Sequence, residues 1–88
     1  MNKITYFYLK NCPYCKKADK FIEELLQENA DFKNIEITKI EESQNPDIVA
    51  NYDYYYVPCF YFNDTEKVLE GDLSKSDIEM MLTKALAD

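Results

Sequence analysis

The most informative segment of the sequence is Lys3-Ile4-Thr5-Tyr6-Phe7-Tyr8-Leu9-Lys10-Asn11-Cys12-Pro13-Tyr14-Cys15. Its first part, residues 3–9, is rich in β-branched and aromatic side chains and predicts a strand buried on both faces. Pro13 marks the start of a helix, because its missing N–H costs nothing at the first helical position. The apolar positions that follow at helical spacing, up to about Glu28, are Ala18, Phe21, Ile22, Leu25 and Leu26. A strand that passes directly into a helix is therefore expected, with two cysteines at the junction.

The middle of the chain predicts one more strand and a short helix. Residues 32–38 alternate enough between apolar and polar side chains to indicate a second strand. Asn45 followed by Pro46 is typical of a helix start, and the apolar positions that follow extend the helix to Tyr52.

The C-terminal part predicts a hairpin and a last helix. Residues 59–62 indicate a third strand, and the turn at Asn63-Asp64 pairs it with residues 67–70. After a turn at Gly71, Ser74 and Asp77 form a capping-box pattern, and an apolar stripe continues to Leu86. Since a βαβ unit pairs its strands in parallel, the order β-α-β-α-β-β-α predicts an α/β fold. We expect a mixed four-stranded sheet with three helices on its two faces.

Composition limits the classes of function. The chain has 88 residues, which predicts a single domain over residues 1–88, and a net charge of −7 with no histidine. This charge argues against nucleic-acid binding, and the missing histidine excludes Ser–His and Cys–His catalysis and His-ligated zinc. No apolar stretch approaches the roughly 20 residues of a membrane span, and the N-terminus lacks the pattern of a secretory signal. We therefore expect a cytoplasmic monomer without a membrane partner.

Charge is unevenly distributed along the chain. Residues 1–20 carry five lysines and one acidic residue, a balance of +4, whereas residues 21–88 carry a balance of −11. The basic end of the chain contains Cys12 and Cys15, and Lys10 is the cation that precedes Cys12 most closely. A positive environment favours a thiolate over a thiol.

Cys12 and Cys15 are spaced for reversible disulfide chemistry. Residues three apart on a helical turn approach the Cα separation of roughly 4.4–6.8 Å that a disulfide requires. Cys12 precedes the helix, where unpaired N–H groups and the helix dipole favour an anion, so we expect it to be the nucleophile. Cys15 lies on the first turn, from which it can attack a mixed disulfide on Cys12.

A second candidate element is the pair Val57-Pro58, which leads into the predicted strand 59–62. A cis peptide bond between these residues would expose the backbone of Val57 for pairing with an extended substrate. Cys59 directly follows and is interpreted as a small buried apolar residue of that strand.

The chain resembles the glutaredoxins. The residues that carry the resemblance are Cys12-Pro13-Tyr14-Cys15 on a strand-to-helix turn, Val57-Pro58 ahead of an aromatic strand, and Gly71 before a last helix. It extends over essentially the whole chain. It implies a thioredoxin fold and a thiol–disulfide oxidoreductase that reduces protein or glutathione mixed disulfides, in electron transport and cell redox homeostasis.

The same resemblance implies roles for particular residues. Its catalytic set is Cys12 as nucleophile, Cys15 as resolving thiol, Lys10 and Pro13. Its substrate-binding set is Tyr14, Val57, Pro58, Gly71 and Asp72. Glutathione is the implied co-substrate, disulfide-containing proteins are the implied clients, and neither a bound cofactor nor a metal is expected.

Alternatives remain open. The segment Glu70-Gly71-Asp72-Leu73-Ser74-Lys75 places Glu70 where glutaredoxins have the first of two glycines, and it is more similar to thioredoxins. That similarity favours a flavin-dependent, thioredoxin-reductase-type electron donor. A different class is a metal or iron–sulfur module that uses Cys12, Cys15 and Cys59. A third is a carrier for one dedicated client, which would dock on the aromatic cluster of Tyr52, Tyr54, Tyr55 and Tyr56.

Overall fold

The computed structural model describes residues 1–87, which form a four-stranded mixed sheet with strand order β2-β1-β3-β4. The regular elements, in chain order, are β1 (Ile4–Tyr8), α1 (Pro13–Glu28), β2 (Ile37–Glu41), α2 (Pro46–Val49), β3 (Cys59–Phe62), β4 (Glu66–Glu70) and α3 (Lys75–Ala87). Two 3₁₀ helices, η1 (Ala30–Asn34) and η2 (Glu42–Gln44), flank β2. Strand β1 pairs in parallel with β2 and antiparallel with β3, and β3 pairs antiparallel with β4. The predicted mixed sheet with three helices is confirmed.

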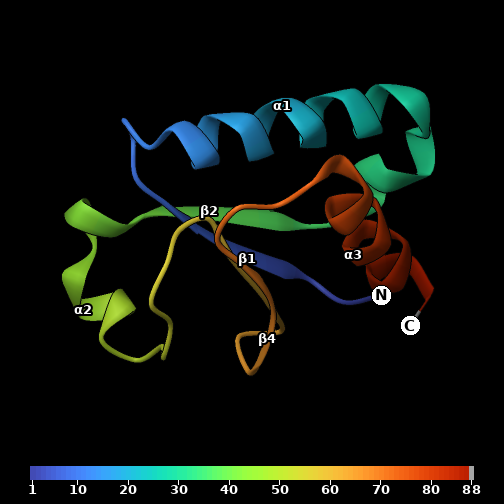
Figure 1. The fold of residues 1–88 in the computed structure, drawn as a ribbon. Coiled ribbons are helices and arrows are strands. Elements are labelled where there is room, and N and C mark those ends of the chain that lie inside the picture. Colours follow the sequence, from blue (N-terminus) through green and yellow to red (C-terminus); the bar gives the residue numbers. More distant parts are fainter. Residues whose placement is uncertain (88) are drawn as a thin grey trace.

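The sheet lies between α1 and α3 on one side and α2 on the other (Figure 1), and an apolar cluster fills each side. Helices α1 and α3 cover one face, where Ile4, Tyr6 and Phe60 are completely buried. The short helix α2 and the segment that follows it cover the other face, where Phe7 and Cys59 are completely buried. Neighbouring residues of β1 therefore point into different cores, which explains why the strand carries large apolar and aromatic side chains on both faces, with the buried polar residue Thr5 among them.

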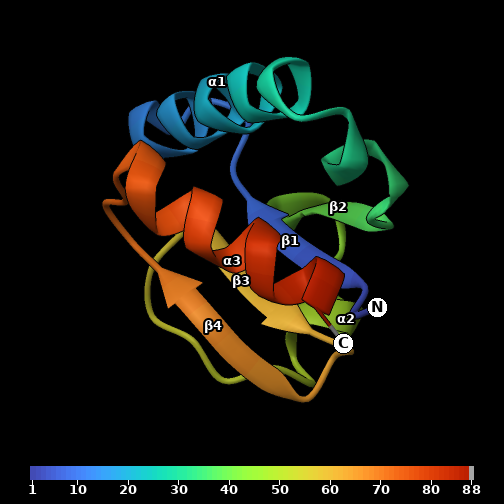
Figure 2. The same cartoon turned by 90° about the vertical axis from the view of Figure 1, so that its right-hand side faces the viewer.

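Helix α1 begins and ends as the sequence predicts, at Pro13 and Glu28. The apolar side of the helix packs on the sheet through Ala18 and Leu25, both 1% exposed. Figure 2 shows α1 and α3 crossing the same face of the sheet, with the start of α1 near the loop between β4 and α3. The fold thus holds the N-terminus of α1 at the edge of the molecule where β1 ends.

The second strand lies later in the chain than predicted. Residues 30–34 form η1, and β2 begins at Ile37 instead of residue 32. The apolar positions Phe32 and Ile35 are buried against α1 and α3 from this 3₁₀ turn, which the Asn29 side chain caps by accepting a hydrogen bond from the Asp31 amide at 3.0 Å. Helix α2 is also shorter than expected: it ends at Val49, and Tyr52 follows in a turn.

The C-terminal half follows the predicted hairpin and capping box. Asn63 and Asp64 adopt positive φ values of 52° and 64°, as the turn between β3 and β4 requires. Ser74 and Asp77 exchange hydrogen bonds between side chain and backbone, both at 3.0 Å, at the start of α3. Among residues 1–87, no helix combines the length and the apolar character that crossing a membrane requires.

Candidate functional site

Cys12 lies at the N-cap position of α1, in the turn that leaves β1. Its backbone is extended (φ −80°, ψ 120°), and its N–H donates a hydrogen bond to the carbonyl of Leu9 at 3.2 Å. The thiol is partly exposed, and its Sγ lies 3.8 Å from the carbonyl oxygen of Val57. The structure therefore places an accessible sulfur at the positive end of a 16-residue helix, next to main chain from a distant part of the sequence.

Cys15 lies one turn further along the helix and has a different environment. Its side chain is only 1% exposed. Burial, assisted by a hydrogen bond with the Cys12 side chain, raises the pKa of the Cys15 thiol to about 12, although the backbone of Leu9 acts in the opposite direction. Two cysteines three residues apart thus differ in access to solvent, and only Cys12 is open to a large disulfide substrate.

A polar cluster lies beneath Cys15 on the sheet. The hydroxyl of Tyr6 is 2.8 Å from a carboxylate oxygen of Asp19 and 3.1 Å from the carbonyl of Cys15. Asp19 also forms an ion pair with Lys39 at 3.4 Å. Burial and the hydrogen bond to Asp19 raise the pKa of Tyr6 well above its usual range, so this hydroxyl stays protonated as a donor. The cluster ties the first turn of α1 to strand β1.

The Val57–Pro58 segment brings the second half of the site to Cys12. The peptide bond between Val57 and Pro58 is cis, and the carbonyl of Pro58 accepts a hydrogen bond from the Gly71 amide at 2.8 Å. Gly71 has a φ of +91°, a conformation that glycine adopts without steric cost. The sequence-derived candidates Cys12, Val57, Pro58 and Gly71 therefore converge, although 45 residues separate Cys12 from Val57.

The remaining substrate-binding candidates lie around this centre. Tyr14 is 51% exposed on the first turn of α1, and Pro13 beside it is also exposed. The Asp72 carboxylate forms an ion pair with Lys17 of α1 at 2.9 Å. This pair links the loop after β4 to the helix that carries both cysteines.

Lys10 lies beside Cys12, in the turn that follows β1. Its backbone N–H donates to the Glu41 carboxylate at 3.1 Å. An open pocket of about 350 Å³ is lined here by Leu9, Lys10, Asn11, Cys12, Glu41 and Ser43. Hydrogen bonds from Ser43 and from the backbone of Lys10 hold the pKa of Glu41 below its ordinary value. Lys10 and Glu41 thus place opposite charges in the pocket that Cys12 also lines.

In the sequence, Glu70 is notable only because it stands where glutaredoxins have a glycine. The sequence does not predict its contacts. One oxygen of its carboxylate accepts hydrogen bonds from the amides of Tyr55 and Tyr56, and the other pairs with Lys67 at 3.0 Å. The signal in the sequence is a charged residue directly before the only glycine of the chain, at the end of a strand.

Cys59 lies apart from the reactive centre. Its side chain is completely buried between the sheet and the α2 side, and burial raises the pKa of its thiol to about 12. Within residues 1–87, no group of three or more histidine, cysteine, aspartate or glutamate side chains is arranged to hold a metal ion. The metal module suggested by the three cysteines therefore has no geometric support in the described part of the chain.

Comparisons with known proteins agree with this fold. The family model described as Thioredoxin matches residues 2–84. Among solved structures, thioredoxin from Fasciola hepatica superposes with a TM-score of 0.74 at 22% identity, covering 96% of this chain and 80% of that one. Thioredoxin 1 from Thermosipho africanus gives a TM-score of 0.70 at 24% identity, covering 97% and 94% of the two chains.

A third solved structure, an uncharacterized thioredoxin-like protein from Clostridium perfringens, is 28% identical, with a TM-score of 0.68 and coverage of 97% of this chain and 71% of that one. A search of the curated proteins gave no match. The family model extends over nearly the whole sequence, and the fold is the one these structures share. The chain belongs to the thioredoxin family.

Proposed function

We propose that this protein is a thiol–disulfide oxidoreductase that reduces disulfides of client proteins through Cys12 and Cys15. The observation that carries the proposal is the asymmetry of the two thiols: Cys12 is accessible at the start of α1, whereas Cys15 is 1% exposed and has its pKa raised to about 12. Thioredoxin-fold proteins generally catalyse this exchange, and membership of the family supports the same reaction here.

The reaction proceeds in two thiol exchanges. The Cys12 thiolate attacks one sulfur of the client disulfide, so that a bond from Cys12 to that sulfur forms and the second client sulfur leaves as a thiolate. Cys15 then loses its proton and attacks the Cys12 sulfur, which releases the first client sulfur and leaves a Cys12–Cys15 disulfide. The client gains two electrons and the protein loses two. A later exchange with an external thiol donor restores the dithiol.

The two cysteines have separate tasks because their environments differ. Cys12 lies at the N-cap position of α1, and unpaired N–H groups and the helix dipole favour an anion at such a position. Cys15 stays protonated while Cys12 is free, because its pKa lies far above neutral pH. Lys10 is proposed as the cation nearest to the Cys12 thiolate, and Pro13 as the residue that fixes the start of the helix.

Client main chain is proposed to pair with the backbone of Val57, next to Cys12. The support is the 3.8 Å distance between Cys12 Sγ and the Val57 carbonyl, which places a main-chain group directly beside the reacting sulfur. Tyr14 is 51% exposed, and Tyr55 and Tyr56 are 81% and 69% exposed. These aromatic surfaces are proposed to contact the client around the disulfide.

Two electron donors are candidates, and different features favour each. Glutathione is favoured by the Cys12-Pro13-Tyr14-Cys15 sequence. A flavin-dependent reductase of the thioredoxin-reductase type is favoured by the loop after β4, because the ion pair with Lys17 already engages Asp72. We propose that the reaction takes place in a reducing compartment, the cytoplasm, where free thiols persist.

A trapping experiment in a Cys59→Ala background tests the roles of the two thiols. Cys15→Ser should accumulate a mixed disulfide on Cys12 when a client disulfide is added, whereas Cys12→Ser should accumulate none. A mixed disulfide trapped on Cys15 instead would reverse the roles of the two cysteines. Reduction of the client disulfide by Cys12→Ser at the wild-type rate would overturn the proposal.

Reduction of the oxidised protein, measured separately with glutathione plus its reductase and with a thioredoxin reductase, identifies the donor. The loop after β4 predicts faster turnover with the thioredoxin reductase. Faster turnover with glutathione would show that Asp72 does not prevent glutathione binding.

A further inference from the structure

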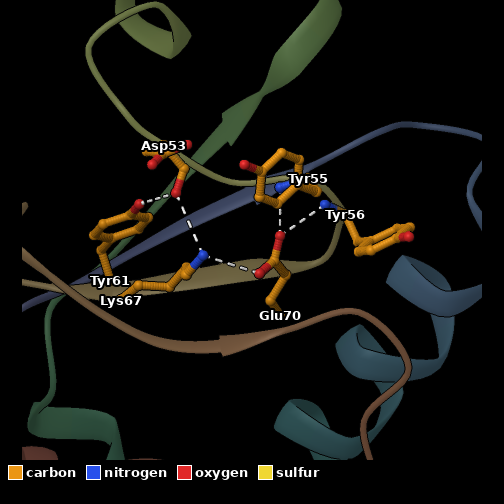
Figure 3. Close-up of polar contacts among 6 residues, drawn as sticks. All are labelled: Asp53, Tyr55, Tyr56, Tyr61, Lys67 and Glu70. Carbon is orange, nitrogen blue, oxygen red and sulfur yellow. Dashed lines mark hydrogen bonds and ion pairs between the residues drawn. The ribbon is translucent and has the colours of Figure 1, made fainter.

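Residues 53–56 form the approach to Val57 and lack regular secondary structure. Their backbone nevertheless has defined partners in the β3–β4 hairpin (Figure 3). The carbonyl of Asp53 accepts hydrogen bonds from the Tyr61 hydroxyl at 2.8 Å and from the Lys67 ammonium at 3.4 Å. The amides of Tyr55 and Tyr56 both donate to one oxygen of the Glu70 carboxylate, the latter at 2.8 Å. Side chains of the hairpin thus take the place of a neighbouring strand.

The side chains of Tyr55 and Tyr56 add little to this anchoring beyond the Lys67 ammonium, which lies 6.0 Å from the centroid of the Tyr55 ring. They are 81% and 69% exposed, so burial does not fix their positions. The Glu70 side chain is only 19% exposed, and its second oxygen is held by Lys67 at 3.0 Å. A carboxylate that accepts hydrogen bonds from main-chain amides forms charge-assisted bonds, which are stronger than neutral ones. Within the segment, Tyr54 is also fixed by stacking on Phe7 and by its hydrogen bond to Glu42, whereas the backbone of Tyr55 and Tyr56 depends on Glu70.

A β-bulge brings Lys67 and Glu70 to one face of strand β4. In regular pairing, residues three apart on a strand point to opposite faces. Here Phe60 pairs with Leu69 and Tyr61 with Lys67, so Val68 is an extra residue. The bulge places Lys67 on the same side as Glu70, where their ion pair forms. Bulges re-aim side chains in this way beside functional sites.

The anchored segment continues directly into the site. Tyr56 is followed by Val57, whose carbonyl is 3.8 Å from Cys12 Sγ. On the far side, the amide of Gly71, the residue after Glu70, donates to the carbonyl of Pro58 at 2.8 Å. Two consecutive residues at the end of β4 therefore hold the main chain on both sides of Val57, one through its side chain and one through its amide.

We propose that Glu70 is a positioning residue of the exchange reaction: its carboxylate holds the backbone of Tyr55 and Tyr56 and thereby fixes Val57 beside Cys12 for pairing with client main chain. This inference rests on the proposed function. It assigns a function to Glu70, which stands where glutaredoxins have a glycine. Glu70 acts through Val57 and does not itself touch the reacting sulfur atoms.

The test compares Glu70→Ala and Glu70→Gln with Glu66→Ala, a control at an exposed position of the same strand. Hydrogen exchange of the Tyr55 and Tyr56 amides measures the anchoring independently of enzymatic activity. Glu70→Ala should accelerate both at least tenfold. Glu70→Gln should give a smaller effect, because the amide oxygen still accepts both hydrogen bonds without a charge. Exchange that is unchanged in Glu70→Ala would overturn the proposal.

Kinetics then connect the anchoring to the reaction. With a disulfide-containing peptide, Glu70→Ala should lower kcat/KM about tenfold through a higher KM, with partial recovery in Glu70→Gln. The rate at which iodoacetamide alkylates Cys12, a reaction that needs no main-chain pairing, should stay within about twofold of the rate in the wild-type protein. An unchanged KM despite faster amide hydrogen exchange would refute the positioning role. A loss of alkylation rate as large as the loss of kcat/KM would also refute it. Failure of the proposed function itself is distinguishable, because Cys12→Ser would then retain activity.

Discussion

Cys15 and Cys59 are both buried thiols, and burial raises the pKa of each to about 12. They differ in what surrounds them: Cys15 lies next to Cys12 at the start of a helix, while Cys59 lies in the middle of the sheet. Only Cys12 is partly exposed. Residue type alone therefore does not decide reactivity here, because position on the element determines access and charge.

Limited alkylation should separate the three thiols. With limiting iodoacetamide at pH 8, we expect Cys12 to react at least about 100-fold faster than Cys15 or Cys59, since a thiol with a pKa of about 12 is almost entirely protonated at that pH. Peptide mapping by mass spectrometry gives the order of modification. In urea, all three should react at similar rates. Equal labelling of Cys59 in the native state would contradict the buried position.

Tyr6 is expected to stabilise the protein through its hydroxyl. It is completely buried and donates to the Asp19 carboxylate at 2.8 Å. Tyr6→Phe should therefore lower the free energy of unfolding by about 1.5–3 kcal/mol, as for hydrogen bonds to charged groups. Urea denaturation measures this change, with Tyr8→Phe, on the same strand and only partly buried, as the control. A loss no larger than that of the control would show that the bond is dispensable.

At the scale of elements, local signals predict what local interactions decide. Helix α1 is predicted from Pro13 to about Glu28 because the proline and the helical periodicity both lie within it. The predicted start of β2 is wrong because Phe32 and Ile35, three residues apart, lie on one side of a capped 3₁₀ turn and are buried there, whereas alternation holds only from Ile35 onward. The contacts of Glu70 are not predictable, since they depend on a bulge at Val68 and on a loop 14 residues earlier.

The capping box is the element-scale feature with the clearest measurable effect. Ser74→Ala removes the oxygen that accepts from the Asp77 amide, so we expect a loss of about 1 kcal/mol in the free energy of unfolding. Ser76→Ala, at an exposed position on the same helix, serves as the control in a urea titration. If both variants were equally stable, the hydrogen bonds between Ser74 and Asp77 would contribute nothing to the free energy of unfolding.

At the scale of the whole molecule, titration should limit stability on both sides of neutral pH. Among residues 1–87, hydrogen bonds and ion pairs in the folded state lower the pKa values of four carboxyl groups: Glu41, Asp64, Glu70 and Asp77. A lowered pKa contributes stability above the unfolded-state value and loses it as pH falls through the folded-state value. Stability should therefore decline progressively below about pH 4.5.

The opposite sign applies to the buried thiols and phenols. Burial raises the pKa values of Cys15, Cys59, Tyr6 and Tyr52, so their contribution is complete below the unfolded-state pKa and is lost as pH rises towards the folded-state value. Urea midpoints from about pH 3 to about pH 11 should trace a plateau that declines below about pH 4.5 and above about pH 9. A midpoint unchanged at the acid end of this range would show that the carboxylate contacts do not stabilise the fold.

The anchoring of residues 53–56 through main-chain atoms also bears on how this protein can change over evolution. Backbone amides and a backbone carbonyl make the contacts to the hairpin, so these contacts require no particular side chain at positions 55 and 56, whereas the Tyr54 side chain packs on Phe7. Tyr55 and Tyr56 can be exchanged for other residues while Val57 keeps its place. In the proposed reaction, client preference and catalytic geometry are thereby encoded at separate positions, so substitutions at positions 55 and 56 should change client preference while Cys12 and Val57 stay in place.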